Sequence, residues 1–323
     1  MAVFTPVTDD QARVWLEGHT VGDFVSLHAI AEGVENTNYR LETSKGRFVL
    51  TLFEGRTDAA SLPFCLGFTD QLAAQGFPAA RPVRDRSGEW IGTLNGRSAA
   101  VVEWLSGAWL RSPSGSDLGQ AGAMLARLHM TAGDFGGRRA NPVGPVAWRA
   151  LADRSAAGLS QGLVHGVTAL EDRAILDGVE AALARVGDLR TDDLPRGAIH
   201  ADYFPDNVLF QDGAVSGVID FYFGCTDALA YDLAIALSAW GFDGEGRLIA
   251  GAVEAFRRGY ESVRPLSRAE VEALPRLGEI AALRFTLTRL HDRIFHDPAN
   301  LVTPKDPAAF YRRMDYWRAL EPA

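Results

Sequence analysis

Lysine is scarce in this chain of 323 residues. Of its 32 lysine and arginine residues, only Lys45 and Lys305 are lysines. A mechanism that depends on a buried lysine therefore has almost no candidate residue. Cysteine is scarce as well, since the chain has only Cys65 and Cys225, which lie far apart. Two isolated thiols are typical of a protein in a reducing cytosol and do not form a disulfide framework.

Two further absences narrow the class of function. No apolar run approaches the roughly 20 residues of a membrane-spanning helix, and the segment MAVFTPVTDD lacks the basic and apolar regions of a signal peptide. The net charge of −9 argues against nonspecific binding of nucleic acid, which needs a basic surface. We therefore expect a cytoplasmic protein without nucleic-acid or membrane partners. The sequence does not indicate an oligomeric state.

Residues 1–104 are predicted to form a β-rich lobe. Thr8 is placed to cap a short helix over 8–17, and a second helix is predicted over 59–75, where GFP ends it. The β-rich runs around these helices predict five antiparallel strands: SLHAIAE, NYRLETS, GRFVLTLFE, EWIGTL and SAAVVEWL. A hinge is expected over 101–107.

Residues 105–323 are predicted to form a larger, mainly helical lobe. Its helical pattern is interrupted at HADYFPDNVLF (200–210) and GVIDFYF (217–223), which we interpret as a β-hairpin turning at Asp212-Gly213. Helices are predicted over DLGQAGAMLARLHM and over 147–160, 168–186, 228–240, 247–260, 268–293 and 306–319. The fold class is therefore α+β, with two lobes and room for a ligand cleft between them.

The hairpin carries the residues that phosphoryl transfer requires. One carboxylate must orient the acceptor hydroxyl and accept its proton, while a carboxylate and a carboxamide oxygen hold Mg²⁺. Asp202, Asn207 and Asp220 supply this set, and the hairpin strands would bring Asn207 and Asp220 to neighbouring positions. Each of the three also has a plainer interpretation as a turn or cap residue.

Other polar residues nearby have structural interpretations. Asp206 is interpreted as a solvated turn residue rather than a catalyst. Asp227 and Asp232 are typical of helix N-termini, where the helix dipole favours a carboxylate. Cys225 is interpreted as a small buried thiol.

The motif HADYFPDNVLF…GVIDF, with RLH at 127–129 and YDLA at 231–234, resembles the catalytic core of the aminoglycoside phosphotransferase and choline kinase-like superfamily. Within it the chain resembles the homoserine kinases, and the likeness covers nearly the whole chain. The closer match rests on MAVFTPVT, AEGVENTNYRL, FVLTLFE, LPF, IDFYFGCTDALAYDLAI, LRFTLTRL and KDPAAF.

The resemblance implies a protein-kinase-like fold, ATP and Mg²⁺ as cofactors, and phosphorylation of L-homoserine in threonine biosynthesis. It implies that Asp202 is the catalytic base and that Asn207 and Asp220 are the magnesium ligands. It further implies that His200 supports the catalytic loop and that Asp232 binds loop backbone.

The expected nucleotide site departs from the protein-kinase pattern. Protein kinases carry a lysine on the third strand, whereas this chain has Thr51 there. Asn36, Thr37 and Asn38 could donate hydrogen bonds to phosphate or simply form a hairpin loop. An arginine such as Arg40 or Arg47, or magnesium alone, would then neutralise the phosphates.

The adenine and the acceptor have separate expected sites. Val102, Glu103 and Leu105 would form the adenine-binding hinge, or pack as an ordinary edge strand and linker. Arg284 and Arg289 are candidates for the homoserine carboxylate, because guanidinium binds carboxylate bidentately; the alternative for each is a structural salt bridge on the helical lobe. Tyr203 or Asp206 would face the amino group. Both arginines lie on one predicted helix, about 140° apart around its axis.

Three other functions compete with this one. Another small-molecule kinase of the same fold would act on choline, an aminoglycoside or a sugar-like alcohol. A nucleotide-binding pseudoenzyme would not need the retained Asp202, Asn207 and Asp220. A metal-dependent phosphoesterase would need more compactly placed histidines than the sequence offers.

Overall fold

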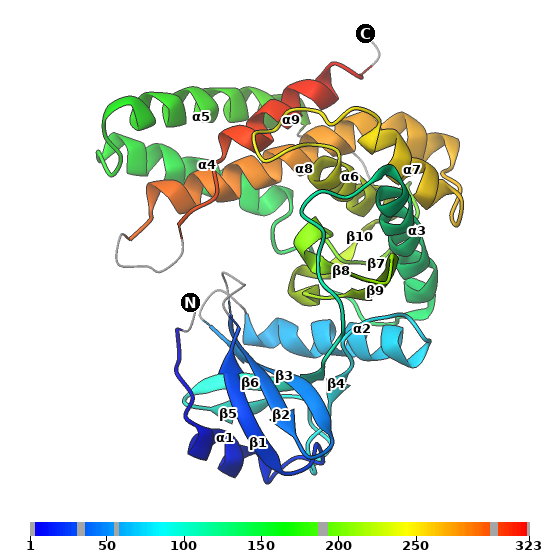
Figure 1. Cartoon of the computed structure of the whole chain (residues 1–323). Coiled ribbons are helices and arrows are strands. Elements are labelled where there is room, and N and C mark those ends of the chain that lie inside the picture. Colours follow the sequence, from blue (N-terminus) through cyan, green and yellow to red (C-terminus); the bar gives the residue numbers. More distant parts are fainter. Residues whose placement is uncertain (1–3, 31–35, 55–57, 187–192, 298–302, 322–323) are drawn as a thin grey trace.

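The computed structural model describes residues 4–30, 36–54, 58–186, 193–297 and 303–321. It has the predicted α+β, two-lobe architecture, with a small β lobe below a larger helical lobe (Figure 1). Across these described residues, no helix is both long and apolar enough to cross a membrane.

The β lobe is built on an antiparallel sheet, with six strands in the described part of the chain. β6 (Arg97–Glu103) lies between β3 (Gly46–Phe53) and two short strands, β4 (Pro82–Val83) and β5 (Gly92–Leu94). The sheet continues from β3 through β2 (Thr37–Thr43) to the edge strand β1 (Phe24–Ala29). Five strands were expected; β4 was missed because two residues are too few to show a periodic pattern.

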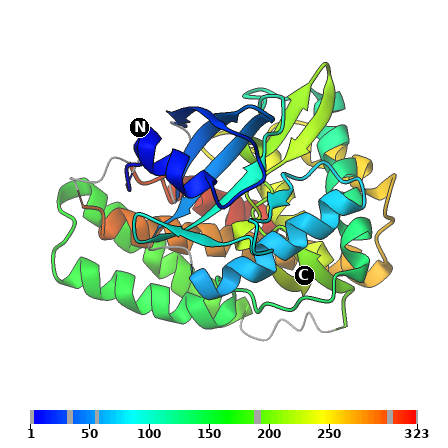
Figure 2. The same ribbon diagram turned by 90° about the horizontal axis from the view of Figure 1, so that it is seen from below.

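Successive side chains along each strand point to opposite sides of the sheet, so its two faces carry different residues. Leu50 and Leu52 pack with Leu16 of α1 (Asp9–Leu16), whose N-terminus is capped by Thr8 as predicted. The opposite face packs against α2 (Leu62–Ala74), through residues such as Val102 and Leu66. Figure 2 shows α2 running alongside the sheet, with the helical lobe behind both. Thr51 lies on this second face, which turns toward the helical lobe.

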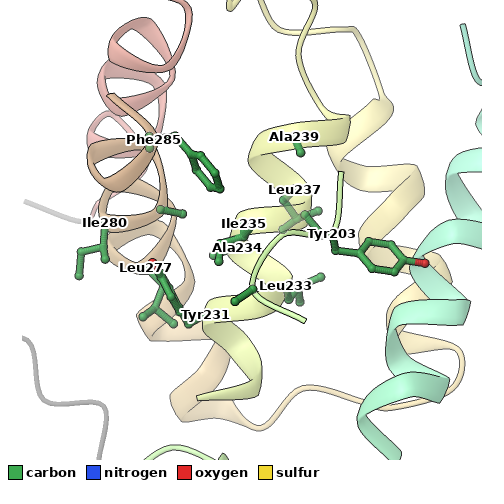
Figure 3. Packing of buried hydrophobic residues seen from close by; sticks show 14 of the residues in the cluster. Tyr203, Tyr231, Leu233, Ala234, Ile235, Leu237, Ala239, Leu277, Ile280 and Phe285 are labelled. Atoms are coloured by element: carbon green, nitrogen blue, oxygen red, sulfur yellow. The ribbon is translucent and has the colours of Figure 1, made fainter. Parts of the chain in front are cut away.

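The helical lobe has a core around two long helices, α6 (Leu229–Trp240) and α8 (Arg268–Ile294). Every residue of α6 from 230 to 240 is buried, and Figure 3 shows its side chains between those of α8 and the ribbon of α3. The other helices are α3 (Gly115–Thr131), α4 (Pro145–Ser160), α5 (Gly166–Val186), α7 (Ala252–Glu261) and α9 (Ala308–Arg318). Each overlaps a helix predicted from the sequence.

Two small ladders lie at the face of the helical lobe that meets the β lobe. The predicted hairpin is present as β8 (Val208–Gln211) and β9 (Ala214–Val218). A second ladder, β7 (Arg196–Ile199) with β10 (Cys225–Ala228), was not predicted, because four-residue strands carry little pattern. The loop from β7 to β8 therefore starts on one ladder and ends on the other.

The connector between the lobes is fastened to the hairpin. Ala108 and Phe210 exchange both of their backbone hydrogen bonds, at 3.0 and 2.8 Å, and the Ser216 hydroxyl donates to the Ser106 carbonyl. These contacts fix the path that the chain takes out of β6 relative to the catalytic hairpin.

Helices α3 and α7 approach closely enough to require glycine. A Cβ atom at Gly122 of α3 would overlap the carbonyl oxygen of Phe256 in α7, and one at Gly259 of α7 would overlap that of Gly119. Backbone atoms cannot give way as a flexible side chain can, so the two helices would have to move apart.

We therefore expect Gly122→Ala to lower the free energy of unfolding by about 1–3 kcal/mol, the usual cost of overpacking. Gly115→Ala, at the start of the same helix, is the control, because its Cβ would meet nothing within 4 Å. Chemical denaturation of both variants measures the difference. Equal stability of the two variants would contradict the packing described here.

Candidate active site

A buried carboxylate anchors the loop between β7 and β8. Asp232, in the first turn of α6, is fully buried. Its oxygens accept the backbone N–H groups of His200 and Ala201, both at 2.8 Å, and face the His129 Nε2 atom at 3.0 Å. This confirms the expectation that Asp232 binds loop backbone. One ionised side chain thus holds two consecutive peptide groups of the loop.

His129 extends the anchor into the helical core. It lies on α3, and its Nδ1 atom is 2.7 Å from the Tyr260 hydroxyl of α7. Burial alone would raise the pKa of Asp232, but the hydrogen bonds from the His129 side chain and from the His200 backbone lower it overall. The carboxylate therefore stays ionised inside the lobe.

His200 joins the loop to the segment that carries Asp220. Its Nδ1 atom accepts the Asp202 backbone N–H at 3.2 Å, so its Nε2 atom carries the proton and donates to the Ile219 carbonyl at 2.9 Å. Burial lowers the pKa of His200, which favours this neutral form. The ring is placed to support the loop rather than to exchange a proton with substrate.

Asp202 follows a residue in the left-handed conformation, Ala201, with φ of 61°. Such a backbone is disfavoured for alanine and must be held by its surroundings. The Ala201 carbonyl accepts a hydrogen bond from Arg284 Nη1 at 2.6 Å, while its N–H is held by Asp232. Burial raises the pKa of Asp202, and the charge of Arg284 opposes the rise.

Asn207 is oriented by Asp202. Its Nδ2 atom donates to the Asp202 carbonyl at 2.8 Å and lies 3.3 Å from Asp202 Oδ2, so its Oδ1 atom is directed elsewhere. The Ile219 N–H donates to the Asn207 carbonyl at 3.0 Å, which places Asn207 beside the next residue, Asp220. Asp220 is exposed and has φ of 65°. The structure thus brings the three predicted residues together.

This donor set suits magnesium. Mg²⁺ prefers oxygen ligands and is usually held by one or two protein carboxylates together with substrate phosphates. Asn207 offers its carboxamide oxygen and Asp220 its carboxylate. Within the described ranges, no group of three or more His, Cys, Asp or Glu residues is arranged to hold a metal without a substrate.

The residues expected at the phosphates divide into two sets. Asn36 is occupied structurally, because its Oδ1 atom accepts the Glu54 N–H at 3.1 Å. The Thr37 hydroxyl is also occupied, donating to Glu54 at 2.8 Å and accepting the Phe4 N–H. Both side chains are buried. Residues 32–35 of the same turn lie outside the described part of the chain.

Asn38 and Thr51 lie on the sheet face that meets the helical lobe. They are register partners on β2 and β3, and the Thr51 hydroxyl donates to Asn38 Oδ1 at 2.7 Å. This hydrogen bond uses the Asn38 side-chain oxygen and not its amide nitrogen. Neither lysine is on β3: Lys45 donates to the Thr20 carbonyl, and Lys305 lies 4.0 Å from Asp206 of the catalytic loop. Of the arginines considered, Arg40 pairs with Glu42 and Arg47 lies over Trp104.

The expected hinge residues lie at the end of β6. Val102 is buried against α2, the Glu103 N–H donates to the Arg81 carbonyl at 2.9 Å, and Leu105 packs against Gly217 of the hairpin. The Glu103 N–H is therefore already bonded within the sheet.

Tyr203 requires a correction. It was expected to face the acceptor, but its side chain is fully buried and its hydroxyl donates to the Ala121 carbonyl of α3 at 3.0 Å. Figure 3 shows the ring pointing toward α3. In a loop there is no strand or helix period from which to predict which way a side chain points.

The two candidate arginines differ in their surroundings. Arg284 is buried against the Ala201 carbonyl and the rings of Phe285 and Phe223. Arg289 lies over the Phe310 ring, and its hydrogen bond, to the Asp306 carbonyl, is long at 3.3 Å. Burial lowers the pKa of Arg289 to about 10. Nearby carboxylates oppose this lowering, and Asp202 has the largest effect among them. Among the residues that the structure describes, Arg289 forms no ion pair.

Sequence reasoning missed two residues that contact this site. His129 was noticed only as part of RLH, which is the signal that could have identified it. Arg139 was not considered, although its Nη1 atom is 2.8 Å from the Tyr222 carbonyl, two residues after Asp220. No local pattern marks this arginine, because the contact spans more than 80 residues.

Asp232→Asn tests the loop anchor. An amide offers one acceptor where the carboxylate offers two, so a buried N–H of His200 or Ala201 would lose its partner, at a cost of about 1–3 kcal/mol. We expect a lower melting temperature and at least a tenfold lower kcat. The control is Asp212→Asn, at the exposed hairpin turn with φ of 53°, where asparagine is tolerated. Wild-type stability and activity for Asp232→Asn would exclude the anchoring role.

Comparison with known proteins agrees with this geometry. A family model described as "Phosphotransferase enzyme family" matches residues 26–266. A homoserine kinase of Gluconacetobacter diazotrophicus is 47% identical over 99% of this chain and 97% of its own length. A homoserine kinase of Acidiphilium cryptum is 46% identical over 98% of this chain and 96% of its own length. A solved amicoumacin kinase has the same fold, with a TM-score of 0.68 at 16% identity, over 97% of this chain and 94% of that one.

Because the family model covers most of the chain and these relatives match it from end to end, the chain belongs to the phosphotransferase enzyme family, in the branch of it that contains the homoserine kinases.

Proposed function

We propose that this enzyme transfers the γ-phosphoryl group of ATP to the side-chain hydroxyl of L-homoserine, giving O-phospho-L-homoserine for threonine biosynthesis in the cytoplasm. The observation that carries the proposal is the grouping of Asp202, Asn207 and Asp220 on one hydrogen-bonded loop and hairpin. The names of the full-length relatives support homoserine as the acceptor.

In this proposal Asp202 orients the homoserine hydroxyl and accepts its proton. Its raised pKa makes it a stronger base than an ordinary aspartate, and the hydrogen bond from Asn207 keeps its position fixed. Asn207 and Asp220 would hold Mg²⁺, which neutralises phosphate charge when it is bound. His200 supports the loop without changing its own protonation.

The nucleotide is proposed to lie against the Thr51 face of the sheet. Asn38 and Thr51 would contact the phosphates. The adenine would reach the hinge at 101–107, which we propose as the boundary between an N-terminal lobe (1–104) and a C-terminal lobe (105–323). Val102, Glu103 and Leu105 remain the proposed adenine contacts, although Val102 is already covered by α2.

For the acceptor carboxylate we propose Arg289 rather than Arg284. The Arg284 guanidinium is committed to the Ala201 carbonyl, whereas Arg289 is a desolvated cation without an ion pair among the described residues. A carboxylate would supply the charge-assisted hydrogen bonds that Arg289 lacks. Asp206 is exposed, and its contact with Lys305 is long at 4.0 Å, so we propose that it faces the ammonium group.

The acceptor is tested by ADP release over a panel of L-homoserine, choline, an aminopropanol and an aminoglycoside. We expect Mg²⁺-dependent turnover with homoserine, and its loss in Asp202→Ala with ATP binding largely retained. Turnover with another member of the panel and none with homoserine would contradict the acceptor assignment. Turnover retained in Asp202→Ala would remove Asp202 from its role as base.

The two arginines are separated by their kinetic effects. Arg289→Met should raise the KM for homoserine at least tenfold, because it removes the cation for the carboxylate. Arg284→Met should mainly lower kcat, because it releases the Ala201 carbonyl. Arg268→Met, on the same helix with the arginine side chain 92% exposed, is the control. An unchanged KM in Arg289→Met would exclude Arg289 as the carboxylate ligand.

A further inference from the structure

The segment that follows Asp220 has a backbone that needs external support. Asp220 is left-handed, and the next residues form the 3₁₀ turn η4 (Phe221–Phe223) before the chain enters β10. Aspartate adopts the left-handed conformation more readily than most residues, but the conformation still has to be held by its surroundings. The direction of the Asp220 carboxylate therefore depends on what holds the carbonyl groups of this turn.

Arg139 holds them. Its Nη1 atom donates to the Tyr222 carbonyl at 2.8 Å and to the Gly224 carbonyl at 2.7 Å. The backbone of Arg139 is fixed to the following strand, because its carbonyl accepts the Thr226 N–H at 2.7 Å and its N–H donates to the Thr226 hydroxyl at 3.2 Å. The guanidinium thus closes the turn between Asp220 and β10.

The charge of Arg139 is directed at these carbonyls. Within the described residues Arg139 forms no ion pair, and the third atom near its Nη1, at 3.3 Å, is Cys65 Sγ. Burial raises the pKa of Cys65 to about 11, so this sulfur is a neutral thiol at physiological pH. Hydrogen bonds from a charged donor are stronger than neutral ones, and here two of them converge on one short turn.

The same turn joins the two lobes. Cys65 lies on α2 and its Sγ atom is 3.5 Å from the Tyr222 carbonyl. The Tyr222 ring packs edge-on against Phe53 of β3, with centroids 5.0 Å apart. In protein kinases a lysine–glutamate ion pair links the third strand to the neighbouring helix; here Thr51 replaces that lysine.

We propose that Arg139 is a positioning residue for the magnesium site. It fixes the turn after Asp220 and ties that turn to helix α2, so that the Asp220 carboxylate points at the metal. The proposal rests on the function proposed above, in which Asp220 holds Mg²⁺. Loss of a residue that orients a metal ligand typically lowers metal affinity or activity 10–100-fold.

The test compares Arg139→Met and Arg139→Lys with Arg138→Met. Arg138 is the exposed neighbour of Arg139, and its side chain makes a long contact, 3.4 Å, to the Gly137 carbonyl. The dissociation constant of Mn²⁺ is measured by electron paramagnetic resonance with enzyme and ADP at equal concentrations. The half-saturating Mg²⁺ concentration for turnover, the KM for homoserine and the melting temperature are measured on the same samples.

We expect Arg139→Met to weaken Mn²⁺ binding and raise the half-saturating Mg²⁺ concentration at least tenfold. The KM for homoserine should stay within twofold. Arg139→Lys keeps the charge, so its metal affinity should lie between those of the wild type and Arg139→Met. This variant also keeps the test valid if the methionine variant is poorly folded. Arg138→Met should match the wild type.

Wild-type metal affinity in both Arg139 variants would overturn the proposal, even if stability or kcat fell. Asp220→Ala separates this failure from that of the proposed function. If Asp220→Ala binds Mn²⁺ as the wild type does, Asp220 is not a metal ligand and the proposed function fails at that residue.

Discussion

The buried Asp232 carboxylate is the constraint on which the catalytic loop depends. Its oxygens hold the N–H groups of two consecutive residues, His200 and Ala201, and a third partner, His129, ties the carboxylate to α3. An ionised group inside a protein is costly unless hydrogen bonds replace its hydration. The helical lobe provides those bonds at the point where the loop leaves β7, so the stability of the lobe and the shape of the loop are coupled.

The remaining geometry follows outward from this anchor. With its N–H held by Asp232 and its carbonyl by Arg284, Ala201 can keep the left-handed conformation that sets the position of Asp202. His200 and Asn207 then each contact Ile219, next to Asp220. The side chains proposed for proton acceptance and metal binding thus share one hydrogen-bonded frame, and Arg139 and Tyr222 connect that frame to the β lobe.

The sequence was most informative where the site is local. Asp202 and Asn207 lie five residues apart and Asp220 follows across a hairpin, so spacing alone predicted that they meet. Long helices, such as α8, were predicted because their apolar pattern runs over several turns. Short β7 and β10 carry no such pattern. His129 and Arg139 reach the site across about 100 and 80 residues, and Tyr203 points into the core from a loop; no local periodicity encodes such contacts.

The proposed enzyme transfers the phosphoryl group directly from ATP to the homoserine hydroxyl. The most direct test is ³¹P nuclear magnetic resonance of the product formed from homoserine labelled with ¹⁸O in that hydroxyl. We expect a new phosphomonoester signal carrying the isotope shift of a bridging ¹⁸O. A spectrum in which ATP is consumed and only inorganic phosphate appears would contradict it.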